Sequence, residues 1–500
     1  MEETYDLLII GGGINGTAKA RDAAGRGLSV LLCEKDDLAS HTSSASTKLI
    51  HGGFRYLEYY EFRLVRESLI ERERLLRAAP HIIWPLRFVL PYEKGIRPAW
   101  LIRLGLFLYD HLGGRELLPG TKTLRLAKSK HKNVLKDHLK LAFEYSDCWV
   151  EDARLVVLNA VDAEQKGAEI RTRTEVSSIE TTQTGYHATI YQHGKYRRIH
   201  AKGIVNSAGP WVEEVLLKLK RNKNSARLRL VKGSHIVTEK LYEGDHCYVF
   251  QNADNRIIFT IPYEENFTLI GTTDLAYQPS DGPVEITEEE TLYLCKAANE
   301  YFRQSILPED VKWSYSGVRP LYDDQAENAS AVTRDYVLHL DEFTESAPFL
   351  SVFGGKITTS RKLAEHALEK IAPYFENLTP AWTKGASFPG GDIPKADFNK
   401  FYQTLKRDFS DIDPLLLKRM ARRYGTNLVQ ILDKNAPKLG RIFNNHLCEA
   451  EVDYLVHHEW VTQAEDILWR RTKAGLHMSQ KEREDFSIWF ETKFSIQKAG

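Results

Sequence analysis

The chain has 500 residues, of which 42% are apolar and 27% charged, so it is long enough for two or three globular domains with sizeable cores. Lys plus Arg equals Asp plus Glu at 68 each, and this balance gives no overall charge that would favour nucleic acid as a partner. The five cysteines are scattered without a C-x-x-C pair, which argues against a zinc site or a disulfide framework and is typical of a reducing cytoplasm.

The N-terminus begins with acidic residues and runs directly into an apolar strand, so we expect no secretory signal. No apolar run reaches the roughly 18 residues that a membrane-spanning helix needs. The nearest segment, 97–114, is interrupted by Arg103 and is either a core helix, which we favour, or an interfacial helix. Two basic runs, 121–140 and 218–232, are either solvated surface or sites of attraction to anionic lipid headgroups.

The first elements predict a strand–turn–helix–strand unit. Residues 7–10 form a continuous apolar run, as expected of a parallel strand that is buried on both faces. Gly11, Gly13 and Gly16 then fit G-x-G-x-x-G. In this motif the first glycine allows a tight turn, the second lets a pyrophosphate approach backbone N–H groups, and the third packs the helix against the strand. An alanine-rich helix and a second strand over residues 28–32 complete the unit.

An acidic residue and a group of hydroxyls follow this unit. Glu34 lies 18 residues after Gly16, where a carboxylate accepts hydrogen bonds from an adenosine ribose. The motif and its acid do not separate NAD from FAD. The next segment, 42–53, has five hydroxyl side chains and ends in two glycines, whose backbone can pass close to a flat ring. An NAD domain would continue here into another helix and strand, so this segment favours FAD, which is buried along its length.

Residues 11–81 resemble the N-terminal third of FAD-dependent glycerol-3-phosphate dehydrogenases of the aerobic bacterial type. Further blocks follow in the order of that family: "VNSAGPWV" from Val205, "LVKGSHIV" from Leu230, "YSGVRPLYDD" from Tyr315, "TRDY" from Thr333 and "SVFGGKITTSRKLAEHALEK" from Ser351. The resemblance extends over essentially the whole chain, including the last hundred residues.

The resemblance implies an α/β fold with a Rossmann-like FAD-binding domain, an antiparallel-sheet substrate domain and an all-α C-terminal domain, as in the wider group of amine- and alcohol-oxidising flavoproteins. It implies oxidation of sn-glycerol 3-phosphate to dihydroxyacetone phosphate by hydride transfer to FAD, with electrons passed to a membrane quinone. It also implies a cytoplasmic protein that is bound peripherally to the inner face of the cell membrane, in contact with anionic lipid.

The chemistry of two glycine-containing segments also agrees with an FAD site. Gly354, Gly355 and Lys356 stand between an apolar strand and an amphipathic helix, where they offer N–H groups and a positive charge to a reduced flavin. Ala208 and Gly209 end another strand with side chains too small to block a dinucleotide. Together with the resemblance, this predicts cofactor contacts from Gly11, Gly13, Asn15, Gly16, Glu34, Ser44, Ser46, Lys48, Gly52, Gly53, Ala208, Gly209, Gly354, Gly355 and Thr358.

A phosphate dianion requires Arg or Lys, and an alcohol that loses a hydride must also lose a proton to a base. The resemblance implies substrate binding by Arg55, Tyr56 and Arg334, and catalytic roles for His235, Lys356 and Arg319. Any single arginine is more simply a surface charge, so this joint assignment depends on the resemblance. His235 is the first candidate for the base because an ordinary histidine titrates near neutral pH, and a desolvated Lys356 is the alternative.

The predicted domains are discontinuous. The FAD-binding domain is expected over 1–75, 145–234 and 345–388, the substrate domain over 76–144 and 235–344, and the helical domain, a cap or a homodimer contact, over 389–500. Three other functions stay open: a glycerol-phosphate oxidase that gives hydrogen peroxide, an amine-oxidising flavoenzyme of the same fold, and a non-catalytic FAD-binding scaffold. The oxidase carries a long insertion that this sequence lacks, and the arginines suit a phosphate better than an amine substrate.

Overall fold

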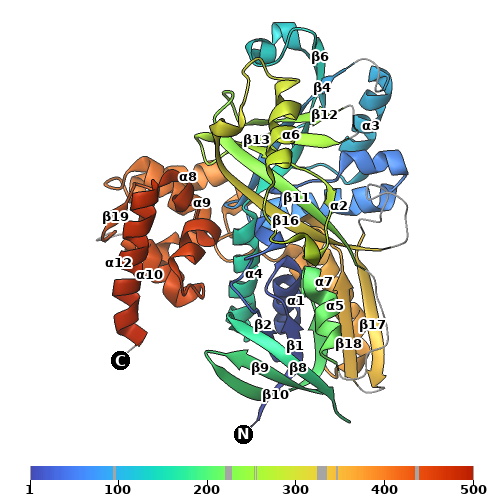
Figure 1. Cartoon of the computed structure of the whole chain (residues 1–500), viewed down its shortest axis with the longest axis vertical. Helices are drawn as coiled ribbons and strands as arrows, with labels where there is room; N and C mark the ends of the chain where they lie inside the picture. Colours follow the sequence, from blue (N-terminus) through green and yellow to red (C-terminus); the bar gives the residue numbers. More distant parts are fainter. Residues whose placement is uncertain are drawn as a thin grey trace.

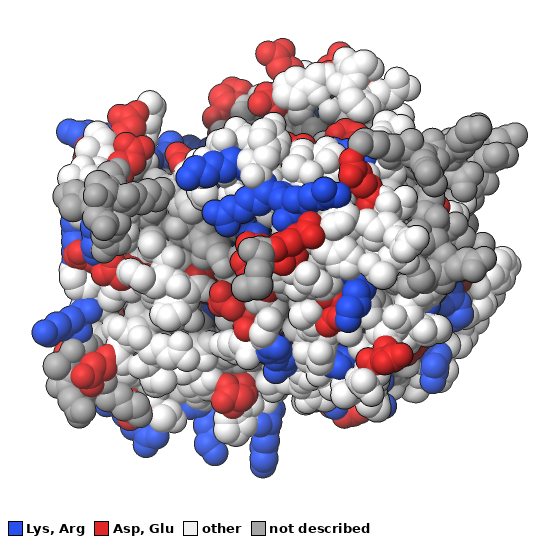
Figure 2. All heavy atoms as spheres, turned by 90° about the horizontal axis from the view of Figure 1, so that it is seen from below, with Lys and Arg blue, Asp and Glu red and all other residues white. Residues whose placement is uncertain are grey.

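The computed structural model describes residues 2–93, 97–219, 228–252, 254, 256–323, 335–344, 347–433 and 438–498. Two large sheets lie one above the other in Figure 1, and the C-terminal helices lie to one side of them. Within the described residues, no helix combines the length and the apolar character needed to cross a membrane. On the face seen from below, basic and acidic side chains are intermingled and form no large patch of one sign (Figure 2).

The lower sheet has eight strands and the order β17-β18-β10-β1-β2-β7, with β9 on β10 and β8 on β9. Its central strands run parallel, whereas β17 and β9 pair antiparallel with their neighbours. Residues 7–10 of β1 pair with strands on both sides and are buried, as the apolar run predicts. The strand bounds are β1 Glu3–Ile10, β2 Val30–Cys33, β7 Glu169–Arg171, β8 Thr174–Thr181, β9 Tyr186–Gln192, β10 Lys195–Asn206, β17 Val337–Thr344 and β18 Ala347–Phe353.

Three helices cover one face of this sheet: α1 (Ile14–Gly25), α4 (Asp152–Gln165) and α7 (Ser360–Ile371). The alanines of α1 let α4 and α7 pack closely against it, and the three helices share one core with the sheet. The short helix α5 (Val212–Leu217) covers a second core on the other face.

The upper sheet has ten strands and the order β15-β11-β14-β13-β12-β4-β6-β3, with β16 on β11 and β5 on β6. All its pairings are antiparallel except that of β12 with β4, so the expectation of an antiparallel sheet is confirmed with this one exception. The bounds are β3 Leu49–Ile50, β4 Ile83–Tyr92, β5 Lys122–Arg125, β6 Leu141–Val150, β11 Leu228–Glu239, β12 His246–Gln251, β13 Ile257–Tyr263, β14 Phe267–Gly271, β15 Leu275–Ala276 and β16 Val311–Tyr322.

The upper sheet is flanked by α2 (Phe62–Ala78), α3 (Ala99–Leu112) and α6 (Glu288–Asn299) (Figure 1). The helix α3 corresponds to the apolar segment 97–114, for which the sequence favoured a core helix. Only Ile102, Leu106 and Tyr109 of α3 are buried, and the opposite face exposes Trp100, Leu101, Leu104, Phe107 and Leu108. The expectation of a core helix is therefore wrong for this face, because no element within the described part of the chain covers it.

The C-terminal part is helical, as predicted, and encloses a core of its own. Its elements are α8 Phe398–Asp408, α9 Pro414–Tyr424, α10 Glu449–His458, the π-helix η13 Asp466–Arg471, α11 Ala474–His477 and α12 Gln480–Lys498, with a small ribbon of β19 Ile442–Phe443 and β20 Leu447–Cys448. Four short 3₁₀ helices border the site described next: η1 Thr42–Ser44, η2 Phe54–Tyr59, η5 Gly209–Trp211 and η8 Ile357–Thr359.

Candidate active site

A cavity of about 190 Å³ lies at the carboxyl ends of β1, β2 and β10, where three parallel strands meet one edge of the lower sheet. Its lining comes from segments that are far apart in the sequence. They are the glycine turn after β1, the segment after β2, the turn after β10 and the glycine pair after β18.

The glycine turn leaves no room for larger residues. Gly11 has φ +107°, and a Cβ atom there would lie 2.6 Å from the carbonyl oxygen of Ser207. A Cβ on Gly16 would lie 1.8 Å from the carbonyl oxygen of Gly11, so this glycine lets α1 pack onto the turn. The roles that the motif predicts for the first and third glycines therefore agree with the packing.

The N-terminus of α1 opens onto the cavity, and side chains fix its position. Ile14 N–H donates to Ser43 Oγ at 2.9 Å, and Asn15 Nδ2 donates to the carbonyl oxygen of Gly354 at 3.0 Å. The second bond ties the first glycine turn to the glycine pair that precedes α7. Since the other first-turn N–H groups of a helix have no intrahelical partner, this end of α1 offers donors and a positive dipole end to an anion.

Glu34 closes one side of the cavity. Its Oε2 accepts from Gly12 N–H at 2.6 Å, and its Oε1 accepts from Asp36 N–H at 2.8 Å. Burial raises the pKa of this carboxyl, although both hydrogen bonds act in the opposite direction. Nearby, the Trp211 ring packs against His41 with ring centroids 4.5 Å apart, and Lys35 Nζ lies 3.8 Å from the Trp211 centroid.

A second cavity, of about 340 Å³, lies between η2 and the upper sheet. Three of its lining residues are arginines: Arg55 from η2, Arg256 beside β13 and Arg319 from β16. Arg319 Nη2 donates to the carbonyl oxygen of Thr273 at 3.1 Å and lies 3.1 Å from a carboxylate oxygen of Asp274. The cavity therefore offers three positive side chains, whose charge its two acidic lining residues, Asp254 and Asp274, offset in part.

The two cavities are linked through the glycine pair before α7. His51, which lines the second cavity, donates its N–H to Thr358 Oγ1 at 3.3 Å. Lys356 follows Gly355, a residue of the first cavity, and its Nζ lies 3.8 Å from the ring centroid of Tyr56 in the second.

His235 lies on β11, buried and outside the lining of either cavity. Its ring stacks on Tyr315, with centroids 4.7 Å apart, and its Nε2 lies 3.0 Å from Thr47 Oγ1. Its Nδ1 has no hydrogen-bond partner among the described residues. Burial lowers the pKa of His235 far below its usual value, and the positive charges of Lys48 and Arg319 lower it further, so the imidazole is neutral.

The comparisons with known proteins agree with this architecture. The family model of FAD-dependent oxidoreductases matches residues 6–361, and the model of the C-terminal domain of alpha-glycerophosphate oxidase matches residues 381–485. The chain belongs to the FAD-dependent oxidoreductase family. FAD is its cofactor, and the fold class and family resemblance predicted from the sequence are confirmed.

Several relatives of this oxidoreductase match over almost their whole length. It is 51% identical to a glycerol-3-phosphate dehydrogenase of Pseudomonas aeruginosa, over 97% of this chain and 94% of the relative. It is 53% identical to a D-erythritol 1-phosphate dehydrogenase of Brucella abortus, over 98% of each chain. A solved structure of the glycerol-3-phosphate dehydrogenase from Bacillus halodurans complexed with FAD aligns with a TM-score of 0.73 and 26% identity, over 98% of this chain and 94% of that one.

The first cavity of the oxidoreductase fits a dinucleotide. Two buried polar atoms of its lining residues, Asn15 Oδ1 and Ser207 Oγ, have no hydrogen-bond partner among the described residues. A Cβ on Gly209 would meet nothing within 4 Å, so this turn leaves open space beside the cavity. The helix end would hold the pyrophosphate, Glu34 the ribose, and the glycine pair before α7 the flavin end of FAD.

The structure brings together eight of the predicted cofactor residues around the first cavity: Gly11, Gly13, Asn15, Glu34, Ala208, Gly209, Gly354 and Gly355. Gly53, Arg55, Tyr56 and Arg319 line the second cavity. Gly16 and Thr358 do not line either cavity but contact residues that do, Gly11 and His51. Gly52 is held farther back by Tyr109, whose hydroxyl accepts from its N–H at 2.7 Å. Arg334 lies outside the described residues.

Three predicted cofactor residues point elsewhere. Lys48 is buried, and its Nζ lies 2.9 Å from both carboxylate oxygens of Asp152. Ser46 Oγ also donates to Asp152, at 2.8 Å, and Ser44 Oγ donates to the carbonyl oxygen of His41 at 3.2 Å. These side chains stabilise the conformation of their own segment. Lys48 pairs with Asp152 because a buried lysine needs a carboxylate partner.

Other residues of the site were missed. Ser43 has no sequence signal that separates it from the neighbouring hydroxyls, and Lys35 and His41, which also line the first cavity, have none at all. The signal for Trp211 is its place directly after Gly209 and Pro210, where a strand end opens onto the cofactor edge of the sheet. Arg256 follows a strand of the upper sheet that the sequence did not connect with Arg55.

Proposed function

We propose that this oxidoreductase oxidises sn-glycerol 3-phosphate to dihydroxyacetone phosphate, with FAD as the hydride acceptor. The second cavity carries the proposal, because it combines three arginines with Tyr56, whose ring lies under Lys356, the residue that follows the glycine pair. Relatives that are 51% and 48% identical, named glycerol-3-phosphate dehydrogenase and aerobic glycerol-3-phosphate dehydrogenase, support it.

Arg55 and Arg319 would bind the phosphate dianion of the substrate. Both line the cavity, and each side chain is 30% exposed. An arginine presents two parallel N–H groups to a phosphate, which fixes orientation as well as charge. Tyr56, held under Lys356, would form the wall of the cavity nearest the glycine pair. Arg334 remains a proposed phosphate ligand on the resemblance alone.

Bound FAD supplies the chemistry of hydride acceptance in this family. The chain itself must take the hydroxyl proton, and His235 is our first candidate. Its imidazole is neutral and Thr47 Oγ1 interacts with Nε2, but its lowered pKa makes it a weak base and it lies outside the lining of both cavities, so its assignment depends on the resemblance. Lys356, which directly precedes η8, is the alternative base, and as a cation it would stabilise negative charge that develops beside it.

We also infer that the protein works at the inner face of the cell membrane and passes electrons to a quinone. Support for the membrane location comes from the exposed apolar face of α3 and from three exposed aromatic residues between the end of η2 and the start of α2, two elements that contact α3: Tyr59, Tyr60 and Phe62. Tyr59 lines the second cavity, so a lipid surface on this side would lie near its mouth. Of the two basic runs, residues 220–227 lie outside the described residues.

A second candidate substrate is D-erythritol 1-phosphate. The 53% identical relative from Brucella abortus is named for it, and the lining of the second cavity also includes Gln251 and Asp254. These polar side chains could hold the extra hydroxyl group of a four-carbon chain.

An anaerobic titration of the purified holoprotein with each phosphate ester would test the proposal by the visible absorption of the flavin. Bleaching at low glycerol 3-phosphate supports it, and selective bleaching by erythritol 1-phosphate favours the second candidate. A flavin band that neither ester bleaches would refute both. Re-oxidation by air with hydrogen peroxide formation would identify an oxidase, whereas re-oxidation that requires a quinone supports the dehydrogenase.

A further inference from the structure

The segment after β2 forms one wall of the FAD cavity and is bonded to the glycine turn at several points. Glu34 and Ser43 accept from Gly12 and Ile14, as described above, and Ala39 N–H donates to the carbonyl oxygen of Gly12 at 3.2 Å. Any shift of this segment would therefore move the groups that face the ribose and the pyrophosphate.

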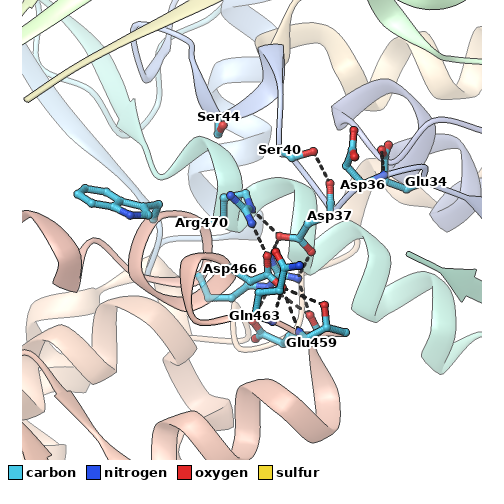
Figure 3. A network of polar contacts seen from close by, with 12 residues as sticks. Glu34, Asp36, Asp37, Ser40, Ser44, Glu459, Gln463, Asp466 and Arg470 are labelled. Atoms are coloured by element: carbon cyan, nitrogen blue, oxygen red, sulfur yellow. Dashed lines mark hydrogen bonds and ion pairs between the residues drawn. The ribbon is translucent and has the colours of Figure 1, made fainter. Parts of the chain in front are cut away.

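Asp37 lies in the middle of this segment and faces away from the cavity, towards the C-terminal helices (Figure 3). Its two carboxylate oxygens accept from Arg471 Nη1 and Nη2 at 2.7 and 2.8 Å, and one of them also accepts from Arg470 Nε at 2.5 Å. Its own carbonyl oxygen accepts from Ser40 N–H and Oγ. Burial would raise the pKa of Asp37, but the two arginines outweigh it and the pKa is lowered, so the carboxylate is charged.

The two arginines are fixed in turn from the other side. Arg471 Nη2 donates to the carbonyl oxygen of Glu459 at 2.6 Å, and the Glu459 carboxylate pairs with Arg154 of α4. Arg470 pairs with Asp466, whose other oxygen accepts from Thr462 N–H at 3.0 Å (Figure 3). The adjacent residues 470 and 471 end the π-helix η13, and both reach the same carboxylate.

Burial makes this network sensitive to the loss of a single member. The side chains of Asp37 and Arg471 are 1% and 0% exposed, so neither charge is solvated if the other is removed. Breaking such a pair leaves an uncompensated buried charge, unlike breaking a pair at the surface.

We propose that the C-terminal helical part acts as a clamp on the FAD site, with Asp37 as the positioning residue through which it acts. Docking of residues 459–471 holds the segment after β2 in its cofactor-binding shape, so FAD binding and docking of η13 favour each other. This coupling depends on FAD binding alone and not on the proposed substrate. In this proposal the C-terminal helical part helps the protein to retain FAD.

The first test is the dissociation constant of FAD for Asp37→Asn, which keeps the shape of the side chain and removes its charge. We expect FAD to bind about 5–150-fold more weakly, the usual range for coupled sites. Arg470→Gln should weaken FAD binding in the same direction, and it is the safer variant because Arg470 is 16% exposed. The matched control is Arg419→Gln, which breaks a 2.7 Å ion pair between α9 and Glu265, away from the cofactor segment.

Two results would overturn the clamp. One is a wild-type affinity for FAD in both Asp37→Asn and Arg470→Gln, and the other is an equal loss of affinity in the control Arg419→Gln. Hydrogen exchange gives an independent measurement, since coupling is reciprocal. Amides of residues 462–471 should exchange more slowly in the FAD-bound protein than after FAD removal. Equal exchange in the two forms would also contradict the proposal.

Discussion

At the scale of single residues, His235 combines a buried position with a neutral imidazole. We expect His235→Asn to lower turnover by about 10²–10⁴-fold, the usual contribution of a general base, while the flavin content stays near that of the wild type. Stopped-flow reduction of the flavin, with absorbance at the start as the measure of bound FAD, checks both quantities. Equal loss of flavin and of turnover would show that His235 is structural.

Two further variants are needed to interpret the result for His235→Asn. His457→Asn changes an exposed histidine on α10 and should leave both quantities unchanged. Lys356→Met removes the alternative base. If Lys356→Met abolishes flavin reduction while His235→Asn leaves it intact, the proton is taken by the lysine.

Residue types in the sequence predicted much of this site but not the direction in which each side chain points. The sequence predicted Gly11 and Gly16 as turn residues because a Cβ atom does not fit where the backbone closes on itself, and a Cβ at either position would lie within 2.6 Å of a backbone oxygen. Lys48 was misplaced because the sequence cannot show that Asp152, 104 residues later, lies beside it. A buried charge finds its partner through the fold, whereas a tight turn is a local property of the chain.

At the scale of elements, the turn between β1 and α1 depends on steric room as well as on glycine conformation. We expect Gly11→Ala to lose FAD, because its Cβ would lie 2.6 Å from a backbone oxygen that cannot move aside. Gly27→Ala is the matched control: its φ of +93° is equally unfavourable for alanine, but its Cβ would meet nothing within 4 Å. It should cost about 1–2 kcal/mol of stability and keep FAD. Flavin content and unfolding midpoints measure the two effects, and loss of FAD from both variants would contradict this account.

The exposed face of α3 gives a second prediction for an element. The double variant Trp100→Ser with Phe107→Ser should abolish co-sedimentation with phosphatidylglycerol vesicles, since each exposed apolar side chain gains about 1.5–3 kcal/mol when buried. Turnover with a soluble dye acceptor should not change. Leu292→Ser, on the exposed side of α6, is the control. Unchanged vesicle binding by the double variant would mean that another surface meets the lipid.

The sequence predicted the elements with strong periodicity and missed those decided by tertiary contacts. The strand and the helix that flank the glycine motif were found because their apolar runs are continuous or periodic. The parallel pairing of β4 with β12 and the π-helix η13 carry no local signal, since both depend on partners far along the chain. The apolar segment of α3 was assigned mainly to the core because apolar residues alone do not say whether another element covers them.

At the scale of the whole molecule, buried histidines should make stability depend on pH. Burial lowers the pKa of His81 to about 3, with Arg154 and Arg422 adding to the shift, and lowers that of His246 to about 3, with His131 and Lys130 adding to it. Unfolded histidines titrate near 6.5, so between about pH 6.5 and 3 the unfolded chain binds more protons than the folded one. This contribution to stability is complete above pH 6.5 and is lost as the pH falls.

As the pH falls from about 6.5 to 3, each of these histidines should therefore lower the free energy of unfolding by about 1.4 kcal/mol per pH unit. His81→Gln should flatten the decline, measured as the urea midpoint at pH 6.5 and pH 5.5. His457→Gln, an exposed position, should leave the slope unchanged. A slope that is the same with and without His81 would show that other groups control acid unfolding.

The bond between Asn15 and Gly354 joins residues 339 positions apart, and it has a consequence for how the protein is made. At about 5–20 residues per second, a ribosome needs about 17–68 s to pass from one to the other. During that interval the nascent chain carries only half of a flavin site, and the arginines that hold Asp37 are synthesised later still. Capture of FAD thus belongs to the last stage of synthesis, and a chain cut short before Gly354 would lack the means to retain its cofactor.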